Sequence, residues 1–147
     1  MACSEASNTR PPLTAELRTL KTAGIRNRPS GPYLLLYRPG PFPRETRDKK
    51  AGELDRLFES LGWRGLSIPE YLILQRVLCE KHSDHRFDLY ARDVACSQWM
   101  WLLDSRLRTG VGMAFWNPRG CRVELGVSDD EVTNARRGAH PTVVIEI

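Results

Sequence analysis

No run of apolar residues in this chain of 147 approaches the roughly 18 that a helix needs to cross a bilayer. The first residues, Met-Ala-Cys-Ser-Glu-Ala-Ser, also lack the apolar core of a secretory signal. Only four cysteines are present, and no two of them have the C-x-x-C spacing that is typical of four-thiolate zinc sites. These absences argue against a membrane protein and against a disulfide-bonded secreted domain. We therefore expect a cytoplasmic protein with reduced thiols and no membrane contact.

The sequence also lacks the short motifs that mark several enzyme classes. It contains no G-x-x-x-x-G-K-[ST], no G-x-G-x-x-G, no H-E-x-x-H and no G-x-S-x-G. Their absence weakens an interpretation as a nucleotide-binding protein, a zinc protease or an α/β-hydrolase. Because 41% of the residues are apolar, the chain can still bury one core of ordinary size.

Charge is unevenly distributed along the chain. Residues 1–50 contain 10 basic and 4 acidic residues, for a net charge of +6, whereas residues 51–147 contain 12 and 14, for −2. The pattern predicts a basic N-terminal arm, residues 1–30, attached to a nearly neutral domain, residues 31–147. Residues 1–12 are small and polar and should be disordered.

Within the arm, Leu13, Leu17 and Leu20 have the spacing of a short amphipathic helix. Such a helix is marginal in water by itself and needs a partner surface. The apolar run from Tyr33 to Tyr37 lies between two prolines, which predicts a strand at the edge of a sheet.

Two helices are predicted next, at about 47–61 and about 68–82. Ala51, Leu54 and Phe58 form the inner stripe of the first helix, and Gly62 is placed to end it. The second helix carries apolar residues around almost its whole circumference, apart from Arg76 and Glu80. We therefore expect it to be central and buried.

The start of the second helix is the best-defined point in the sequence. Ser67 and Glu70 have capping-box spacing, so each can bond the other's backbone N–H group. Leu66 and Tyr71 lie where a hydrophobic staple would close, and Pro69 fits the first turn.

The C-terminal half is predicted to be mostly sheet. Apolar alternation indicates strands at 99–103, 111–116, 121–127 and 142–147, and a polar loop at 128–141. We expect an α+β fold in which an antiparallel sheet of about four strands packs against the two helices, both of them on one face.

The strongest candidate for chemistry is Cys79, His82 and His85, whose C-x-x-H-x-x-H spacing brings a thiol and two imidazoles within two helical turns. With Asp84 and Asp88, these residues support an alternative hypothesis, a small metal-assisted hydrolase or nuclease. We favour an ordinary helix C-terminus, because cations and ring N–H groups there satisfy the last carbonyls and the negative end of the helix dipole. We expect no metal, no cofactor and no catalytic residue.

Other polar residues have structural alternatives. Gln75 projects to the apolar side of its helix, so its amide needs partners. We expect a structural clip to a neighbouring loop, with a polar contact in a ligand pocket as the alternative. Asp84, Asp88, Asp93 and Asp104 could hold Mg²⁺ in pairs, but they also suit turns and caps.

Three functional hypotheses result. We favour a non-catalytic binding or accessory module that contacts nucleic acid or another polyanion through the arm. The predicted contact residues are Arg18, Lys21, Arg26, Arg28, Arg38, Arg44, Tyr33 and Tyr37. The metal-assisted enzyme is the second hypothesis. The third is a subunit of a protein complex, which predicts an exposed aromatic patch around Trp99, Trp101 or Trp116.

Overall fold

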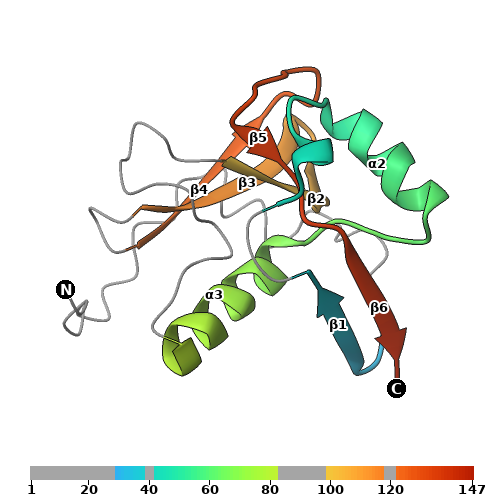
Figure 1. The fold of residues 1–147 in the computed structure, drawn as a ribbon, viewed down its shortest axis with the longest axis vertical. Helices are drawn as coiled ribbons and strands as arrows, with labels where there is room; N and C mark the ends of the chain where they lie inside the picture. The colour runs from blue at the N-terminus through green and yellow to red at the C-terminus, as the bar shows by residue number, and fades with distance from the viewer. Residues whose placement is uncertain (1–28, 39–41, 83–98, 118–121) are drawn as a thin grey trace.

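The chain folds as an α+β protein (Figure 1). The computed structural model describes residues 29–38, 42–82, 99–117 and 122–147. The elements in chain order are β1 (Tyr33–Tyr37), a 3₁₀ turn η1 (Arg44–Thr46), α2 (Ala51–Ser60), α3 (Ile68–His82), β2 (Trp99–Leu107), β3 (Gly110–Asn117), β4 (Arg122–Ser128), β5 (Arg137–Gly138) and β6 (Thr142–Glu146). No helix among the described residues is both long and apolar enough to cross a membrane.

The strands form two separate sheets. The larger sheet has the order β4-β3-β2-β5, in which the first two pairings are antiparallel and the β2–β5 pairing is parallel. The smaller sheet is an antiparallel ribbon of β1 and β6, with Leu35 opposite Val144. The expected four-stranded sheet is therefore present but mixed. Its fourth strand is the short β5, and the predicted strand at 142–147 pairs with β1 instead.

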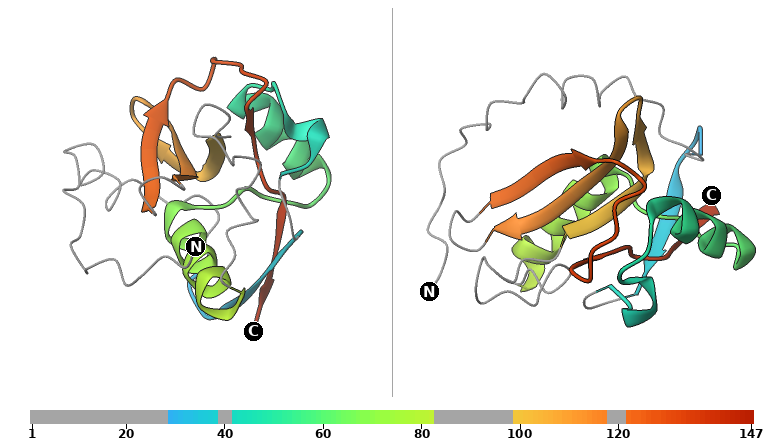
Figure 2. Two further views of the ribbon diagram at one scale, coloured as in Figure 1. Left: turned by 60° about the vertical axis from the view of Figure 1, so that its left-hand side comes forward. Right: turned by 90° about the horizontal axis from the view of Figure 1, so that it is seen from above.

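The two helices pack on opposite faces of the larger sheet, not on one face as predicted. Met100 and Leu102 of β2 contact Tyr71 of α3 in one buried cluster. Their neighbours on β2, Trp101 and Leu103, belong to a second buried cluster with the apolar residues of α2. Successive side chains of a strand point to opposite faces, so β2 has a helix on each side. Figure 2 shows the two helices lying well apart.

Local sequence explains where the helices begin and end. Asp48 has a φ of 55°, a left-handed conformation that aspartate tolerates, so α2 begins at Ala51 and not at the predicted residue 47. The glycine after α2, Gly62, has a φ of 68° and ends the helix as predicted. The α3 helix spans the predicted range, and the N–H group of Ser67 donates to the Glu70 carboxylate at 2.8 Å.

The α3 helix is less buried than the sequence predicts. One side packs on the sheet and the ribbon, but Leu72, Ile73 and Val77 on the other side are 40%, 62% and 38% exposed. The expectation of a helix buried all round is therefore wrong. Apolar residues around a whole helix allow burial on every side. They do not determine on how many sides other elements pack against the helix.

Candidate functional site

The outer face of the β1–β6 ribbon carries a row of exposed apolar side chains. Side chains on β1 alternate, so that Leu34 and Leu36 point outward and each is 52% exposed. The ladder places Leu34 opposite Ile145 and Leu36 opposite Val143. Because directly opposite residues share a face, these four residues form one surface two strands wide, which we call the outer face.

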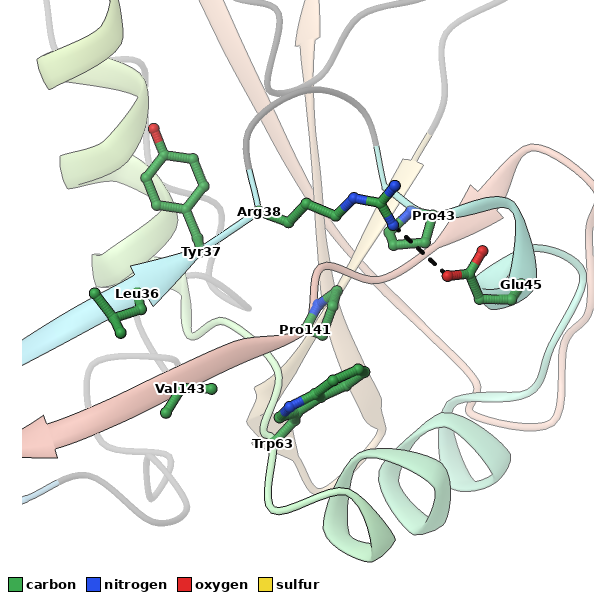
Figure 3. A pocket seen from close by; sticks show the side chains of 8 residues that line it. All are labelled: Leu36, Tyr37, Arg38, Pro43, Glu45, Trp63, Pro141 and Val143. Atoms are coloured by element: carbon green, nitrogen blue, oxygen red, sulfur yellow. Dashed lines mark ion pairs between the residues drawn. The ribbon is translucent and has the colours of Figure 1, made fainter.

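A hollow adjoins one end of the outer face (Figure 3). Leu36 and Val143 form part of its lining, and Trp63, from the connection between α2 and α3, lies across from them. The hollow has a volume of about 250 Å³. Its charged rim consists of Arg38 and Glu45, whose side chains are 64% and 67% exposed and form an ion pair at 3.7 Å.

This region holds half of the exposed large hydrophobic residues in the described part of the chain. Ten such residues are at least 38% exposed, and five of them lie on the ribbon or at the hollow. They are Leu34, Leu36, Trp63, Ile145 and Ile147. Together with the half-buried Val143 they make up what we call the apolar surface. Contiguous exposed apolar area rimmed by polar groups is typical of an interaction site.

The opposite face of the ribbon is bound to the rest of the protein. Leu35 and Tyr37 pack against the cluster that includes α3. The Tyr33 hydroxyl donates to Glu70 at 2.8 Å. At the start of β6, Thr142 and Arg64 exchange two backbone hydrogen bonds of 2.8 and 2.9 Å. The orientation of the apolar surface is therefore fixed by contacts on its inner side.

A buried ionic cluster lies where the ribbon meets the larger sheet. It consists of Arg64, Glu70 and Asp104, whose side chains are only 10%, 6% and 6% exposed. The Arg64 guanidinium forms ion pairs with both carboxylates. Glu70 also accepts hydrogen bonds from the Ser67 N–H at 2.8 Å and from the Ser67 hydroxyl at 2.7 Å. We call this group the Arg64 cluster.

The backbone explains why these charged groups meet. Between Leu102 and Arg106 the ladder with β3 is interrupted, so that residues 103–105 bulge toward the segment before α3. In this bulge the Asp104 N–H donates to the Leu66 carbonyl at 3.3 Å. A Cβ atom at Gly65 would lie 2.5 Å from that of Leu103, so only glycine lets the chain pass here.

The surroundings in the cluster shift the pKa values of its two acids in opposite directions. Burial raises the pKa of Asp104 to about 6, although the Arg64 guanidinium opposes the shift. Burial acts in the same direction on Glu70, but hydrogen bonds from Arg64 and Ser67 lower the pKa of Glu70 below its ordinary value. Both carboxylates are enclosed and engaged by protein groups. The cluster is thus suited to fixing the ribbon rather than to binding a substrate.

The structure places some of the predicted contact residues and not others. Arg38 and Arg44 are exposed near the hollow. The Tyr33 ring lies under the Arg64 guanidinium, 5.9 Å from its carbon, and so has a structural partner. Gln75 is buried and its amide donates to the Tyr71 hydroxyl at 3.2 Å, a contact within its own helix.

The remaining predicted residues cannot be placed. Arg18, Lys21, Arg26, Arg28, Asp84, His85, Asp88 and Asp93 lie outside the described residues, as do the side chains of Cys79 and His82. Asp104, considered above as a Mg²⁺ ligand, is engaged by Arg64 instead. Among the described residues, no three histidine, cysteine, aspartate or glutamate side chains are grouped so that they could hold a metal ion.

The predicted aromatic patch is wrong in its position. Trp101 is fully buried between α2 and the sheet, and Trp99 and Trp116 are only partly exposed. The most exposed tryptophan is Trp63, at 41%. It follows the turn at Gly62, and the sequence offers no periodic pattern there that would mark it as a surface residue.

Comparisons with protein-family models, with curated proteins and with solved structures found no significant match to this chain. Its function therefore has to be argued from the apolar surface and the Arg64 cluster.

Proposed function

We propose that this chain is a non-catalytic protein-binding module and that the apolar surface is where its partner binds. The observation that carries the proposal is that five of the ten exposed large hydrophobic residues in the described part of the chain lie on the ribbon or at the hollow beside it. Monomeric proteins expose single apolar residues routinely, but a contiguous group of this kind usually marks an interface.

The exposed area is sufficient to drive association. At roughly 200 Å² for a large hydrophobic residue, the exposed fractions of these five residues leave about 500 Å² in water. Burying that area is worth on the order of 10 kcal/mol before the entropic cost of association is subtracted. The surplus is compatible with a specific complex of moderate affinity.

The hollow fits an anchor side chain better than a whole ligand. Pockets for drug-sized molecules are about 300–1,000 Å³, whereas this one is about 250 Å³. Trp63 at its wall is the residue type that most often dominates the energetics of protein interfaces. We infer that a partner inserts one large apolar side chain between Trp63, Leu36 and Val143.

Site-specific photo-crosslinking in the natural host tests the proposal. A photoreactive amino acid at Leu36 should give a discrete protein adduct, and Ile145→Lys in the same chain should abolish it. The matched control is the same amino acid at Ile73, which is 62% exposed but lies on α3, away from the ribbon. Equal adducts from both positions, or none from Leu36, would exclude the apolar surface as a binding site.

Contact with a polyanion through the arm stays a prediction, because residues 1–28 lie outside the described part of the chain. The hypothesis of a metal-assisted enzyme likewise stays untested. We prefer the binding module because Glu70 and Asp104, the described acids with shifted pKa values, are buried and paired with Arg64.

A further inference from the structure

We propose that the partner on the apolar surface is a second copy of this chain, packed face to face about a two-fold axis that passes between the Leu34–Ile145 and Leu36–Val143 pairs. This inference rests on the proposed function, since it names the occupant of the same surface. Three observations favour a second copy: the shape of the surface, its charge and its area.

The shape is self-complementary. One end of the outer face carries Leu34 and Ile145, which are 52% and 45% exposed, and Ile147 extends that end at 78%. The other end, two residues along each strand, opens into the hollow beside Leu36 and Val143 (Figure 3). Two residues of a strand span roughly 7 Å. A two-fold axis midway between these ends therefore places the apolar end of each copy over the hollow of the other, and the contact forms twice.

The charge permits self-association. The chain carries a net charge of +4, so two copies repel each other in most orientations. The outer face carries no charged side chain, however, and its rim at the hollow consists of one cation, Arg38, and one anion, Glu45. Glu146 follows Ile145 in β6 and therefore points to the inner face of the ribbon. It pairs there with Tyr33 of β1. Face-to-face packing therefore brings no like charges together on the ribbon.

The area is near the lower limit for a specific dimer. About 500 Å² from each copy gives roughly 1,000 Å² in total, which is the smallest interface that usually supports a specific complex. We therefore expect a reversible dimer with a dissociation constant on the order of micromolar. Sedimentation velocity between about 1 and 200 μM should show the weight-average mass of the full chain rising from one to two copies.

A charge-swap experiment tests the proposed packing. The two-fold axis places Leu34 of one copy opposite Leu36 of the other. Leu34→Lys and Leu36→Glu should each be monomeric throughout this range, because each buries an unpaired charge at the interface. An equimolar mixture of the two variants should dimerise, since the introduced lysine then meets the introduced glutamate and the second contact stays Leu36 on Leu34. Ile73→Glu, on α3, is the matched control and should dimerise like the natural chain.

The outcomes separate this inference from the proposed function. A natural chain that stays monomeric at 200 μM overturns the second copy, and a Leu36 photo-adduct with a different protein would then leave the binding module standing. A dimer that Ile73→Glu also dissociates places the interface elsewhere and overturns the inference. Failure of the mixed variants to associate, with each variant folded by circular dichroism, overturns the face-to-face packing. Dimerisation of the mixture, with each variant monomeric by itself, supports the face-to-face packing.

Discussion

Two runs of five apolar residues, Tyr33–Tyr37 and Trp99–Leu103, look alike in the sequence and have different surroundings in the fold. In β2, Met100, Trp101, Leu102 and Leu103 are all at most 1% exposed. In β1, the side chains alternate between half-buried and exposed, and Leu34 and Leu36 remain 52% exposed.

The difference comes from the number of layers around each strand. β2 lies between α2 and α3, so both of its faces meet a helix. Among the described residues, β1 meets the core through its inner face. A continuous apolar run usually indicates a strand buried on both faces. In β1 the same pattern leaves one face uncovered by the described part of the chain, and that face is what makes the ribbon a candidate interface.

The largest expected loss of stability comes from disrupting the Arg64 cluster, which connects the ribbon to β2. Arg64→Ala would leave the carboxylates of Glu70 and Asp104 buried without their cation. Removing one partner from a buried ion pair typically costs about 3–5 kcal/mol, so we expect a loss of that size in the free energy of urea-induced unfolding. The control is Arg76→Ala, whose ion pair with Glu80 is exposed and should contribute little to stability. Equal losses in the two variants would mean that the Arg64 cluster does not join the two regions.

A matched pair of leucine substitutions tests the comparison of the two strands directly. Leu102→Ala removes a fully buried side chain from β2 and should reduce the free energy of unfolding by about 2–5 kcal/mol. Leu36→Ala in β1 should change it by about 0.5 kcal/mol or less at concentrations below 1 μM, because the side chain is half exposed. Denaturant midpoints of both variants provide the measurement. A large loss for Leu36→Ala in the monomer would show that the outer face is covered within one chain.

The parts of the fold that follow local rules could be predicted from the sequence. Ser67 and Glu70 fixed the start of α3, and Gly62 marked the end of α2, because caps and left-handed positions depend on nearby residues. Tertiary arrangement could not be predicted in the same way. β5 is two residues long and has no periodic pattern, so the pairing of Arg137 with Trp99 had no signal in the sequence. The apolar run of β2 did contain the signal that helices lie on both faces, but the prediction placed both helices on one face.

The candidate site was less predictable than the fold. The Arg64 cluster joins residues 6 and 40 positions apart in the chain through a bulge in β2. No local spacing predicts such a bulge, so Asp104 was interpreted only as a turn, cap or metal-binding residue. Trp63 is exposed because the chain turns at Gly62 and passes the ribbon, which is also a tertiary effect. The alternation of Leu34 and Leu36 could be predicted, but not that their side of the ribbon is uncovered.

The pH dependence of stability distinguishes the Arg64 cluster from the apolar surface, which contains no titratable side chain. Because the pKa of Asp104 is raised from 3.8 to about 6, the folded chain binds this proton more tightly than the unfolded chain. Its stabilising contribution is therefore fully present below about pH 4 and is lost as the pH rises through about 6. We expect the free energy of unfolding to fall by on the order of 1 kcal/mol between about pH 5 and pH 7.

The control for this pH effect is Asp104→Asn, which has no proton to lose and should flatten the slope across the same window. Glu70 acts with the opposite sign, since its pKa is lowered, and it costs stability only as the pH falls below its ordinary value of 4.5. Urea unfolding at half-unit pH intervals measures both slopes. An identical slope in the natural chain and in Asp104→Asn would assign the pH dependence to another group.

Among the substitutions for which we expect a measurable loss of stability, the smallest loss concerns the cap that positions Glu70. Ser67→Ala removes the hydroxyl that donates to the Glu70 carboxylate at 2.7 Å but keeps the backbone N–H that donates to the same oxygen at 2.8 Å. We expect a loss of about 1 kcal/mol in the free energy of unfolding, because one hydrogen bond to the buried Glu70 carboxylate is lost while its other partners remain. Ser60→Ala is the matched control, because the Ser60 hydroxyl donates to a carbonyl at the exposed end of α2 and its loss should be close to zero. If the two serine variants have the same denaturant midpoint, the Ser67 hydroxyl contributes no stability, and the Ser67 N–H group, Arg64 and Tyr33 suffice to hold the Glu70 carboxylate.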